Sequence, residues 1–566
     1  MTDLGDRLVA SLTAAGIGAI FGVPGGQTLP LYRAARGSTL RHVLMRDERA
    51  AACAADAYAR VTGGVGVCDA TVGPGATNLV SGLAEAYSSS IPVLAVVADI
   101  RTDQEHLRRG GVVSQAIDQR AFLAPVTKWV ARVQRADSFD DMLAHALRVA
   151  TTGRPGPVVL EIPDDVFSSP AVDQPVRLTP DDVRVPRYRP APSAVDVHRL
   201  LELLATGERP LILAGGGVVT SGAGDALTAF AEATGTPVAT TIMGKGSIPE
   251  RHPLALGAVG TFGCVRATAA LLEADVVLVV GSKLDQMSTV GFRIPGRGQR
   301  IAHVNLDGEE IGRVTHVDVG AVADARAALD ALRDALDVVA VADRSSWIAT
   351  LPAEPSTVTS SDDPRVAPEA VIDAINRRAP DGHVFVSDAS LASGWSARFY
   401  RSSGAGRTYL APRGLAGIGW AGGAAIGAAI GSGAPVVALA GDGAWGYTMA
   451  EVETAARLRL PITFVILNNA AFGWITHVEN QLQLTELSRL DEADYALAGR
   501  AMGAASARVT SLDALDSELV AAATRSGPTV IEVLSSTDAS PTLRIRDVRR
   551  QAAATDDGPP TSAYAP

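Results

Sequence analysis

Short runs of apolar residues alternate along the chain with stretches in which apolar residues recur at helical spacing. Continuous apolar runs of about four to eight residues are typical of strands buried on both faces of a parallel sheet. The helical spacing between them, clearest over residues 47–62, predicts crossover helices and hence an α/β fold. The predicted strands lie at residues 19–23, 65–68, 93–97, 158–162, 210–217, 237–241, 276–280, 301–305, 384–387, 436–439, 462–467 and 529–533.

Two polar segments divide this pattern into three parts. Residues 168–193 are polar and rich in proline, and residues 343–368 are rich in Ser, Thr, Pro and Asp, which is typical of linkers. We therefore predict three doubly wound parallel-sheet domains, at residues 1–170, 190–342 and 366–540. The remaining residues, 541–566, form a polar tail that is either disordered or a flap over the active site.

Composition and charge exclude several classes of protein. The 566 residues include 50 Lys and Arg and 61 Asp and Glu, so the formal charge is −11, which argues against a nucleic-acid or membrane-surface binder. Hydrophobic residues make up 47% and charged residues 20%, which is a globular rather than a disordered balance. Three cysteines are too few for a disulfide framework or a zinc cluster.

Neither a signal peptide nor a membrane span is expected. The first ten residues lack the basic and apolar regions of a signal peptide. Residues 414–441 carry no charge, but they are mostly Gly and Ala and are interrupted at residues 431–435. They therefore predict a buried helix, a turn and a buried strand rather than a membrane span. We expect a cytoplasmic protein.

Two short motifs follow consecutive buried strands in the last third of the chain. Gly441, Asp442 and Gly443 come directly after one strand, and Asn469 follows the next, with 24 residues between the motifs. Glycines let a phosphate approach the backbone, and carboxylate and amide oxygens suit Mg²⁺. Because ligands bind at the carboxyl ends of strands in open α/β sheets, the pair predicts a magnesium diphosphate site, completed by a backbone carbonyl near Ala471. Two tight turns are the structural alternative.

This pair of motifs resembles that of the thiamine diphosphate-dependent enzymes, and other segments extend the resemblance from about Leu4 to about Leu534. Residues 46–63 look like the family's catalytic segment and place Glu48 on its glutamate. The resemblance implies that Glu48 bonds the pyrimidine ring of the cofactor and favours its imino form, which removes the C2 proton of the thiazolium. The family often has His where this chain has Asp47. An acid at a helix N-terminus is the structural alternative for Glu48.

Three further segments resemble the acetolactate synthase-like branch of this family. Residues 21–26 and 29–32 resemble its entry loop, residues 71–78 the loop that meets the pyrimidine, and residues 414–419 the segment beneath the cofactor. By this resemblance Ile418 wedges the cofactor into its bent shape, with ordinary core packing as the alternative, and the Ala416 carbonyl accepts from the 4′-amino group. The implied cofactor-binding residues are Pro24, Gly25, Glu48, Gly75, Asn78, Ser390, Ala416, Ile418, Gly441, Asp442, Gly443, Ala444, Asn469, Phe472 and Gly473, and the implied Mg²⁺ ligands are Asp442, Asn469 and the carbonyl of Ala471.

The resemblance also implies roles for the three expected domains. The first is similar to a pyrimidine-binding domain, the second to a central Rossmann-like domain and the third to a domain that binds the diphosphate and Mg²⁺. Glu48 and Asp442 belong to different domains, and sites in this family form between subunits. The resemblance therefore implies a homodimer or homotetramer with shared active sites.

Several positions depart from true acetolactate synthases. Their Phe-Gln-Glu segment matches Ser114-Gln115-Ala116, which retains only the Gln, and their substrate-sorting Trp matches Val478. Their Arg-Phe-Asp-Asp-Arg run, which helps hold FAD, matches Lys-Leu-Asp-Gln-Met at residues 283–287. We therefore expect neither anabolic acetolactate synthesis nor FAD. The glycine run at residues 215–217 either receives a nucleotide or is a vestige of a Rossmann-like layer.

The resemblance implies carbon–carbon bond cleavage or formation on a small 2-oxo acid, by a decarboxylase or carboligase. The candidate catalytic residues are Glu48, Gln27, Gln115 and His477, the last as a proton shuttle or as an ordinary surface histidine. A lyase acting on a 2-hydroxyacyl-CoA or 2-hydroxyketone is the alternative, favoured by the missing Phe and Trp and by the basic tail residues Arg544, Arg546, Arg549 and Arg550. A non-catalytic subunit of the same fold is a third hypothesis.

Overall fold

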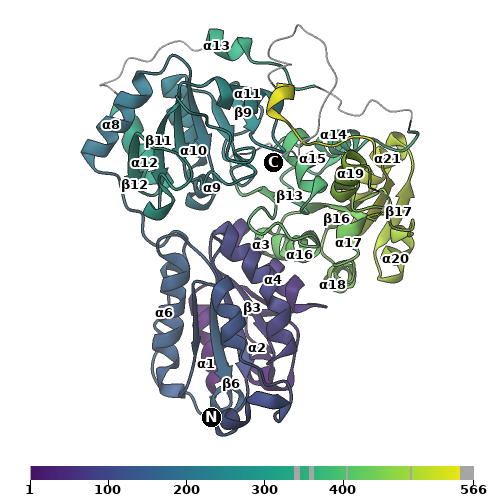
Figure 1. Cartoon of the computed structure of the whole chain (residues 1–566). Coiled ribbons are helices and arrows are strands. Elements are labelled where there is room, and N and C mark those ends of the chain that lie inside the picture. Colours follow the sequence, from purple (N-terminus) through teal and green to yellow (C-terminus); the bar gives the residue numbers. More distant parts are fainter. Residues whose placement is uncertain are drawn as a thin grey trace.

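The computed structural model describes residues 2–336, 345–355, 363–402, 404, 406–484 and 487–548 of the chain. These residues form three six-stranded sheets, one in each third of the chain, and neighbouring strands run parallel. Helices pack around each sheet (Figure 1). The predicted α/β fold with three parallel-sheet layers is therefore confirmed. No helix among the described residues is both long and apolar enough to cross a membrane.

The N-terminal layer has the strand order β2-β1-β3-β4-β6-β5. Its strands are β1 (Ala19–Gly22), β2 (Arg41–Leu44), β3 (Gly66–Ala70), β4 (Val93–Asp99), β5 (Trp129–Arg132) and β6 (Val158–Pro163). Its helices are α1 (Leu4–Ala14), α2 (Leu29–Ala35), α3 (Glu48–Thr62), α4 (Pro74–Ser89), α5 (Gln119–Leu123), α6 (Phe139–Thr151) and α7 (Asp164–Phe167).

The middle layer has the strand order β12-β11-β10-β7-β8-β9. Its strands are β7 (Pro210–Ala214), β8 (Val238–Thr240), β9 (Ala255–Ala258), β10 (Val276–Val280), β11 (Arg300–Asn305) and β12 (Val319–Val322). Its helices are α8 (Ala194–Ala205), α9 (Gly216–Ser221), α10 (Gly224–Thr234), α11 (Val265–Glu273) and α12 (Ala325–Asp334), followed by α13 (Ser345–Thr350).

The C-terminal layer has the strand order β14-β13-β15-β16-β18-β17. Its strands are β13 (Val384–Ser387), β14 (Tyr409–Leu410), β15 (Val436–Gly441), β16 (Ile462–Asn468), β17 (Ala505–Val509) and β18 (Thr529–Leu534). Its helices are α14 (Pro368–Arg378), α15 (Leu391–Phe399), α16 (Ala421–Ser432), α17 (Asp442–Trp445), α18 (Glu451–Leu458), α19 (Gly473–Leu482), α20 (Tyr495–Ala501) and α21 (Leu512–Ala522). The uncharged segment forms α16, a turn and β15, as predicted.

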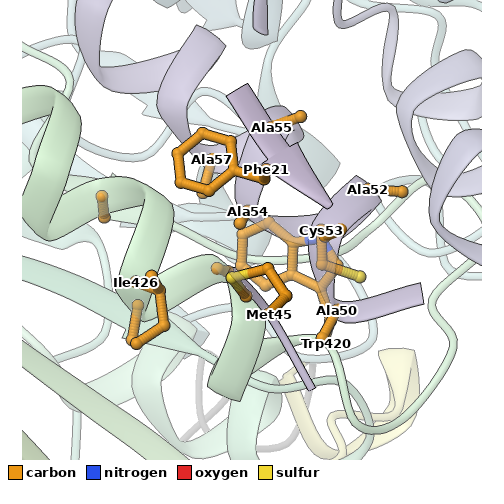
Figure 2. Close-up of a cluster of buried hydrophobic side chains, with 14 of the residues drawn as sticks. Phe21, Met45, Ala50, Ala52, Cys53, Ala54, Ala55, Ala57, Trp420 and Ile426 are labelled. Atoms are coloured by element: carbon orange, nitrogen blue, oxygen red, sulfur yellow. The ribbon is translucent and has the colours of Figure 1, made fainter. Parts of the chain in front are cut away.

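The N-terminal and C-terminal layers are joined where α3 packs against α16. A Cβ added at Gly423 would collide with the Ala50 carbonyl, and one added at Gly427 would collide with the Ala54 carbonyl. The two helices therefore meet backbone to backbone. They share one buried core, to which the layers contribute Phe21, Met45, Trp420 and Ile426 among others (Figure 2).

The described start of the tail packs against the middle layer. The backbone N–H of Leu543 donates to the carbonyl of Thr261 at 2.7 Å, and the side chains of Leu543 and Val548 are buried in a core cluster of that layer. Residues 549–566, with Arg549 and Arg550, lie outside the described residues. So do residues 343–344 and 356–362 of the second predicted linker.

Candidate active site

Glu48 lies at the carboxyl edge of the N-terminal sheet, as the first residue of α3. The carboxylate of Asp47 caps this helix and accepts from the backbone N–H of Arg49 at 2.7 Å, which orients the first turn. Glu48 is buried, and its Oε2 accepts a hydrogen bond from Nδ2 of Asn78 at 2.9 Å. A Cβ at Gly75 would lie 3.2 Å from its Oε1. Gly75 and Asn78, near the start of α4, therefore hold the glutamate in place.

The loops that follow β1 and β3 meet close to Glu48. The Thr71 hydroxyl donates to Oε1 of Gln27 at 2.8 Å, and the Thr71 side chain fills the space that a Cβ at Gly25 would need. Likewise, a Cβ at Gly73 would collide with the backbone carbonyl of Gln115. The side chain of Gln115 is exposed. This edge thus gathers the predicted residues Pro24, Gly25, Gln27, Glu48, Gly75, Asn78 and Gln115.

A pocket opens at the carboxyl edge of the C-terminal sheet, beyond β15 and β16. Many of the site residues predicted from the sequence line this pocket: Ser390, Ile418, Gly441, Asp442, Gly443, Ala444, Asn469, Ala471, Phe472, Gly473 and His477. All of its described lining residues fall between Pro368 and Ala539. Within one chain, Glu48 and the N-terminal residues around it therefore do not line the pocket that contains Asp442.

Two oxygen-bearing side chains in the pocket, Asp442 and Asn469, have no positively charged partner among the described residues. Asp442 is 2% exposed, and burial raises the pKa of its carboxyl to about 6 although backbone N–H groups, including that of Ala471, act in the opposite direction. The Ala471 N–H donates to Oδ2 of Asp442 at 3.2 Å. The Oδ1 of Asn469 is buried and has no hydrogen-bond partner among the described residues. A buried carboxylate without a counter-charge and a buried oxygen without a partner are both costly, so the two side chains together fit a divalent cation.

The described residues contain no group of three or more His, Cys, Asp or Glu side chains placed to hold a metal. A cation between Asp442 and Asn469 would therefore need backbone carbonyl oxygens, such as that of Ala471, and oxygens from a bound ligand or water. Mg²⁺ is commonly held by few protein ligands together with phosphate oxygens. The donor set is thus consistent with a metal that binds together with a diphosphate.

Strained backbone occurs at both of these sheet edges, although it is not confined to them. Four non-glycine residues there have left-handed φ values: Gln115 (65°), Ser390 (63°), Ala416 (61°) and Ala470 (53°). Such conformations cost about 1–3 kcal/mol each and persist where the surroundings hold them, which is typical of ligand sites.

His477 is half-buried on α19 and lines the C-terminal pocket. Burial lowers the pKa of His477, and the nearby backbone of Ala539 and the charge of Asp538 oppose this shift. The neutral imidazole is therefore favoured near pH 7, and a neutral imidazole can accept a proton. This position is more consistent with a pocket residue than with an ordinary surface histidine.

Asp388, a buried carboxylate beside the pocket, was not predicted from the sequence. It accepts hydrogen bonds from the backbone N–H groups of Ala389 (2.8 Å), Gly419 (2.9 Å) and Ala421 (2.9 Å). Burial nevertheless raises the pKa of its carboxyl to about 6. Asp388 directly follows β13, as Asp442 follows β15, and that shared pattern could have identified it.

Glu85 on α4 was also missed. Its carboxylate accepts from the backbone N–H groups of residues 414–416, which belong to the segment beneath the predicted cofactor site. A single acid within a predicted helix gives no signal of this contact. The partners lie more than 300 residues away along the chain.

A second and larger pocket lies at the carboxyl edge of the middle sheet, where Gly216 and Gly217 contribute to its wall. A Cβ at Gly217 would lie 2.8 Å from the Cα of Gly281. Close packing therefore accounts for this glycine whether or not the pocket receives a ligand.

The comparisons with known proteins agree with this geometry. Family descriptions of the thiamine pyrophosphate (thiamine diphosphate) enzymes match all three layers: the N-terminal TPP-binding domain at residues 2–122, the central domain at residues 197–332 and the C-terminal TPP-binding domain at residues 388–533. These matches support thiamine diphosphate as the cofactor.

Curated relatives match over most of their length. A probable acetolactate synthase large subunit of Methanocaldococcus jannaschii is 33% identical over 545 residues, covering 94% of this chain and 91% of the relative. The acetolactate synthase large subunit of Corynebacterium glutamicum is 34% identical over 522 residues, covering 89% and 82%. A probable 2-ketoarginine decarboxylase of Pseudomonas aeruginosa is 34% identical over 538 residues, covering 94% and 93%.

These relatives are enzymes that handle carbon–carbon bonds, which argues against a non-catalytic subunit. With all three layers matched and relatives aligned over most of its length, the chain belongs to the thiamine diphosphate-dependent enzymes of the acetolactate synthase-like family.

Proposed function

We propose that this enzyme cleaves or forms a carbon–carbon bond of a small 2-oxo acid, using thiamine diphosphate and Mg²⁺. The observation that carries the proposal is the pair of buried oxygens at Asp442 and Asn469, of which the Asn469 Oδ1 lacks a partner among the described residues. When bound, thiamine diphosphate supplies a carbanion that adds to a carbonyl and an electron sink for the bond that breaks. The probable 2-ketoarginine decarboxylase among the relatives supports a 2-oxo acid as substrate.

The residues of the C-terminal pocket would hold the diphosphate end of the cofactor. Asp442, Asn469 and the Ala471 carbonyl would bind Mg²⁺, and the pocket is lined by Ser390, Ile418, Gly441, Gly443, Ala444, Phe472 and Gly473. The Ala416 carbonyl would accept from the amino group of the pyrimidine. His477 at the pocket wall would exchange a proton with the substrate.

The N-terminal layer would supply the other half of the site. Glu48, oriented by Asn78, would hold a proton at the pyrimidine, and Gln27 and Gln115 would contact the substrate. Because the described lining of the C-terminal pocket contains no residue of this layer, we infer that a second copy of the chain provides it. The proposal therefore includes a homodimer, or a homotetramer built from such dimers. We expect no FAD requirement.

Asp442→Asn is expected to weaken Mg²⁺-dependent binding of thiamine diphosphate by at least about 10–100-fold, because the carboxylate ligand is lost. Titration calorimetry with and without Mg²⁺ measures this change. Asp491→Asn, which removes the same charge from an exposed position, is the matched control. Equal affinities of Asp442→Asn and the wild type would contradict the metal site.

Glu48→Gln is expected to keep cofactor binding and to lower the rate of C2 proton exchange in the bound cofactor by about 10²–10⁴-fold, because the proton-holding carboxylate is removed. Exchange of the C2 hydrogen into deuterated water, followed by NMR, measures the rate. Glu202→Gln, at an exposed position on α8, is the control. An unchanged exchange rate in Glu48→Gln would refute the assignment.

Mixed oligomers of the Glu48→Gln and Asp442→Asn chains test whether the sites are shared. If each site uses Glu48 of one chain and Asp442 of another, a mixed dimer has one intact site and recovers roughly half of the wild-type activity. Co-production with two affinity tags isolates the mixed species. Failure of purified mixed dimers to regain activity would show that each chain builds its own site.

A panel of carboxyl-labelled ¹³C 2-oxo acids tests the substrate class. Pyruvate, glyoxylate, benzoylformate and 2-ketoarginine are incubated with the holoenzyme, and we expect at least one of them to release ¹³CO₂ and yield an aldehyde or a condensed product. A 2-hydroxyacyl-CoA is included. Aldehyde release from it, with no CO₂ from any 2-oxo acid, would overturn the proposal in favour of a lyase.

A further inference from the structure

Glu85 has an unusual set of partners for a helix residue. It lies on α4 of the N-terminal layer and is 3% exposed. Its carboxylate accepts three successive backbone N–H groups from the C-terminal layer, those of Gly414 (3.0 Å), Leu415 (2.8 Å) and Ala416 (2.8 Å). Hydrogen bonds to a charged acceptor are about twice as strong as those between neutral groups. One buried side chain therefore holds this segment.

The carboxylate of Glu85 is itself held in place. The Ser89 hydroxyl donates to Oε1 at 2.5 Å, and the guanidinium of Arg60 lies 3.6 Å from the same oxygen. Arg60 in turn pairs with Asp56 at 2.6 and 3.0 Å and donates to the carbonyl of Ala411 at 2.9 Å. Arg60 thus offsets part of the charge of Glu85, which it shares with Asp56, and the position of Glu85 is set from two helices of the N-terminal layer.

The segment that Glu85 holds is under strain. Ala416 has a left-handed φ of 61°, and a Cβ at Gly414 would lie 2.6 Å from the backbone nitrogen of Ser89. The segment is therefore pressed against the end of α4. Farther along, Asp388 accepts from the N–H groups of Gly419 and Ala421. Carboxylates from two different layers thus hold the loop on both sides of Ile418.

We propose that Glu85 is a positioning residue, which holds the backbone of Gly414–Ala416 so that the Ala416 carbonyl faces the amino group of the cofactor. The inference rests on the proposed function, in which that carbonyl is the acceptor. It does not rest on interlayer packing, because the contact of α3 with α16 joins the layers independently of Glu85. Each chain would thus support its own diphosphate-side site through Glu85 while lending Glu48 to the site of a second copy.

The first test uses the cofactor-free protein. In Glu85→Gln one carboxylate oxygen is replaced by an NH₂ group, which is a donor, so at least one of the N–H groups of residues 414–416 loses its acceptor. Hydrogen–deuterium exchange read by mass spectrometry should then accelerate in the peptide containing these residues by about tenfold or more. Asp275→Asn is the matched control, because Asp275 accepts from the N–H groups of Glu208 and Arg209 at 2.7 and 3.0 Å in the middle layer. Unchanged protection in Glu85→Gln would overturn the proposal.

The second test uses the holoenzyme. Glu85→Gln should lower both kcat and the rate of C2 hydrogen exchange by at least about tenfold, with KM for the substrate changed by less than about twofold. A loss of thermal stability without a change in C2 exchange would show a merely structural role and overturn the proposal. If Glu85→Gln does not fold, Gly414→Ala displaces the same segment from α4 and should give the same pattern.

The two tests separate this inference from the proposed function. If the wild-type protein shows no C2 exchange with thiamine diphosphate and Mg²⁺, the proposed function fails whatever Glu85 does. If the wild type exchanges and Glu85→Gln exchanges equally fast, only the role of Glu85 fails.

Discussion

The backbone-to-backbone contact of α3 with α16 is the constraint on which the rest of the site depends. The carbonyls of α3 leave no space for a side chain at Gly423 or Gly427, so the close distance between the two helices requires glycine at both positions. Interiors packed at this density do not deform gradually. The packing of α3 on α16 therefore fixes the position of the N-terminal layer relative to the C-terminal layer before any ligand binds. The same packing fixes the positions of the loops at both sheet edges.

The same contact sets where Glu48 lies relative to Asp442. Glu48 begins α3, and the helix runs from there along α16, so the N-terminal layer presents Glu48 outside the pocket that holds Asp442 and Asn469. Polar groups bridge the layers near both ends of α3. Arg46 and Arg49, beside Glu48, donate to the carboxylate of Glu451 and the carbonyl of Tyr447. Arg60 and Glu85, farther along the helices, meet the segment at residues 411–416. The two layers of one chain are thus bonded together while Glu48 stays outside the pocket that contains Asp442.

The central strands of each sheet could be predicted from the sequence, but the edge strands could not. The six strands that the apolar runs did not reveal are β2, β5, β9, β12, β14 and β17, and each lies at the edge of its sheet. Strands in the middle of a parallel sheet are covered on both faces and read as continuous apolar runs. Edge strands such as β2 and β12 are partly exposed or, like β14, very short, so their residues carry no such pattern.

In the candidate site, too, some residues could be predicted from their neighbours in the sequence and others could not. Asp442 and Asn469 could be predicted because each follows a buried strand, and ligands bind at the carboxyl ends of the strands in open α/β sheets. Glu85 could not be predicted, because its partners are backbone N–H groups, which every residue except proline has. Helix α4 also contacts these groups only when the layers are packed together. The sequence pattern at strand ends therefore indicates candidate ligand-site residues, and it could also have indicated Asp388, whereas Glu85, which holds the loop from another layer, emerges only from the packed structure.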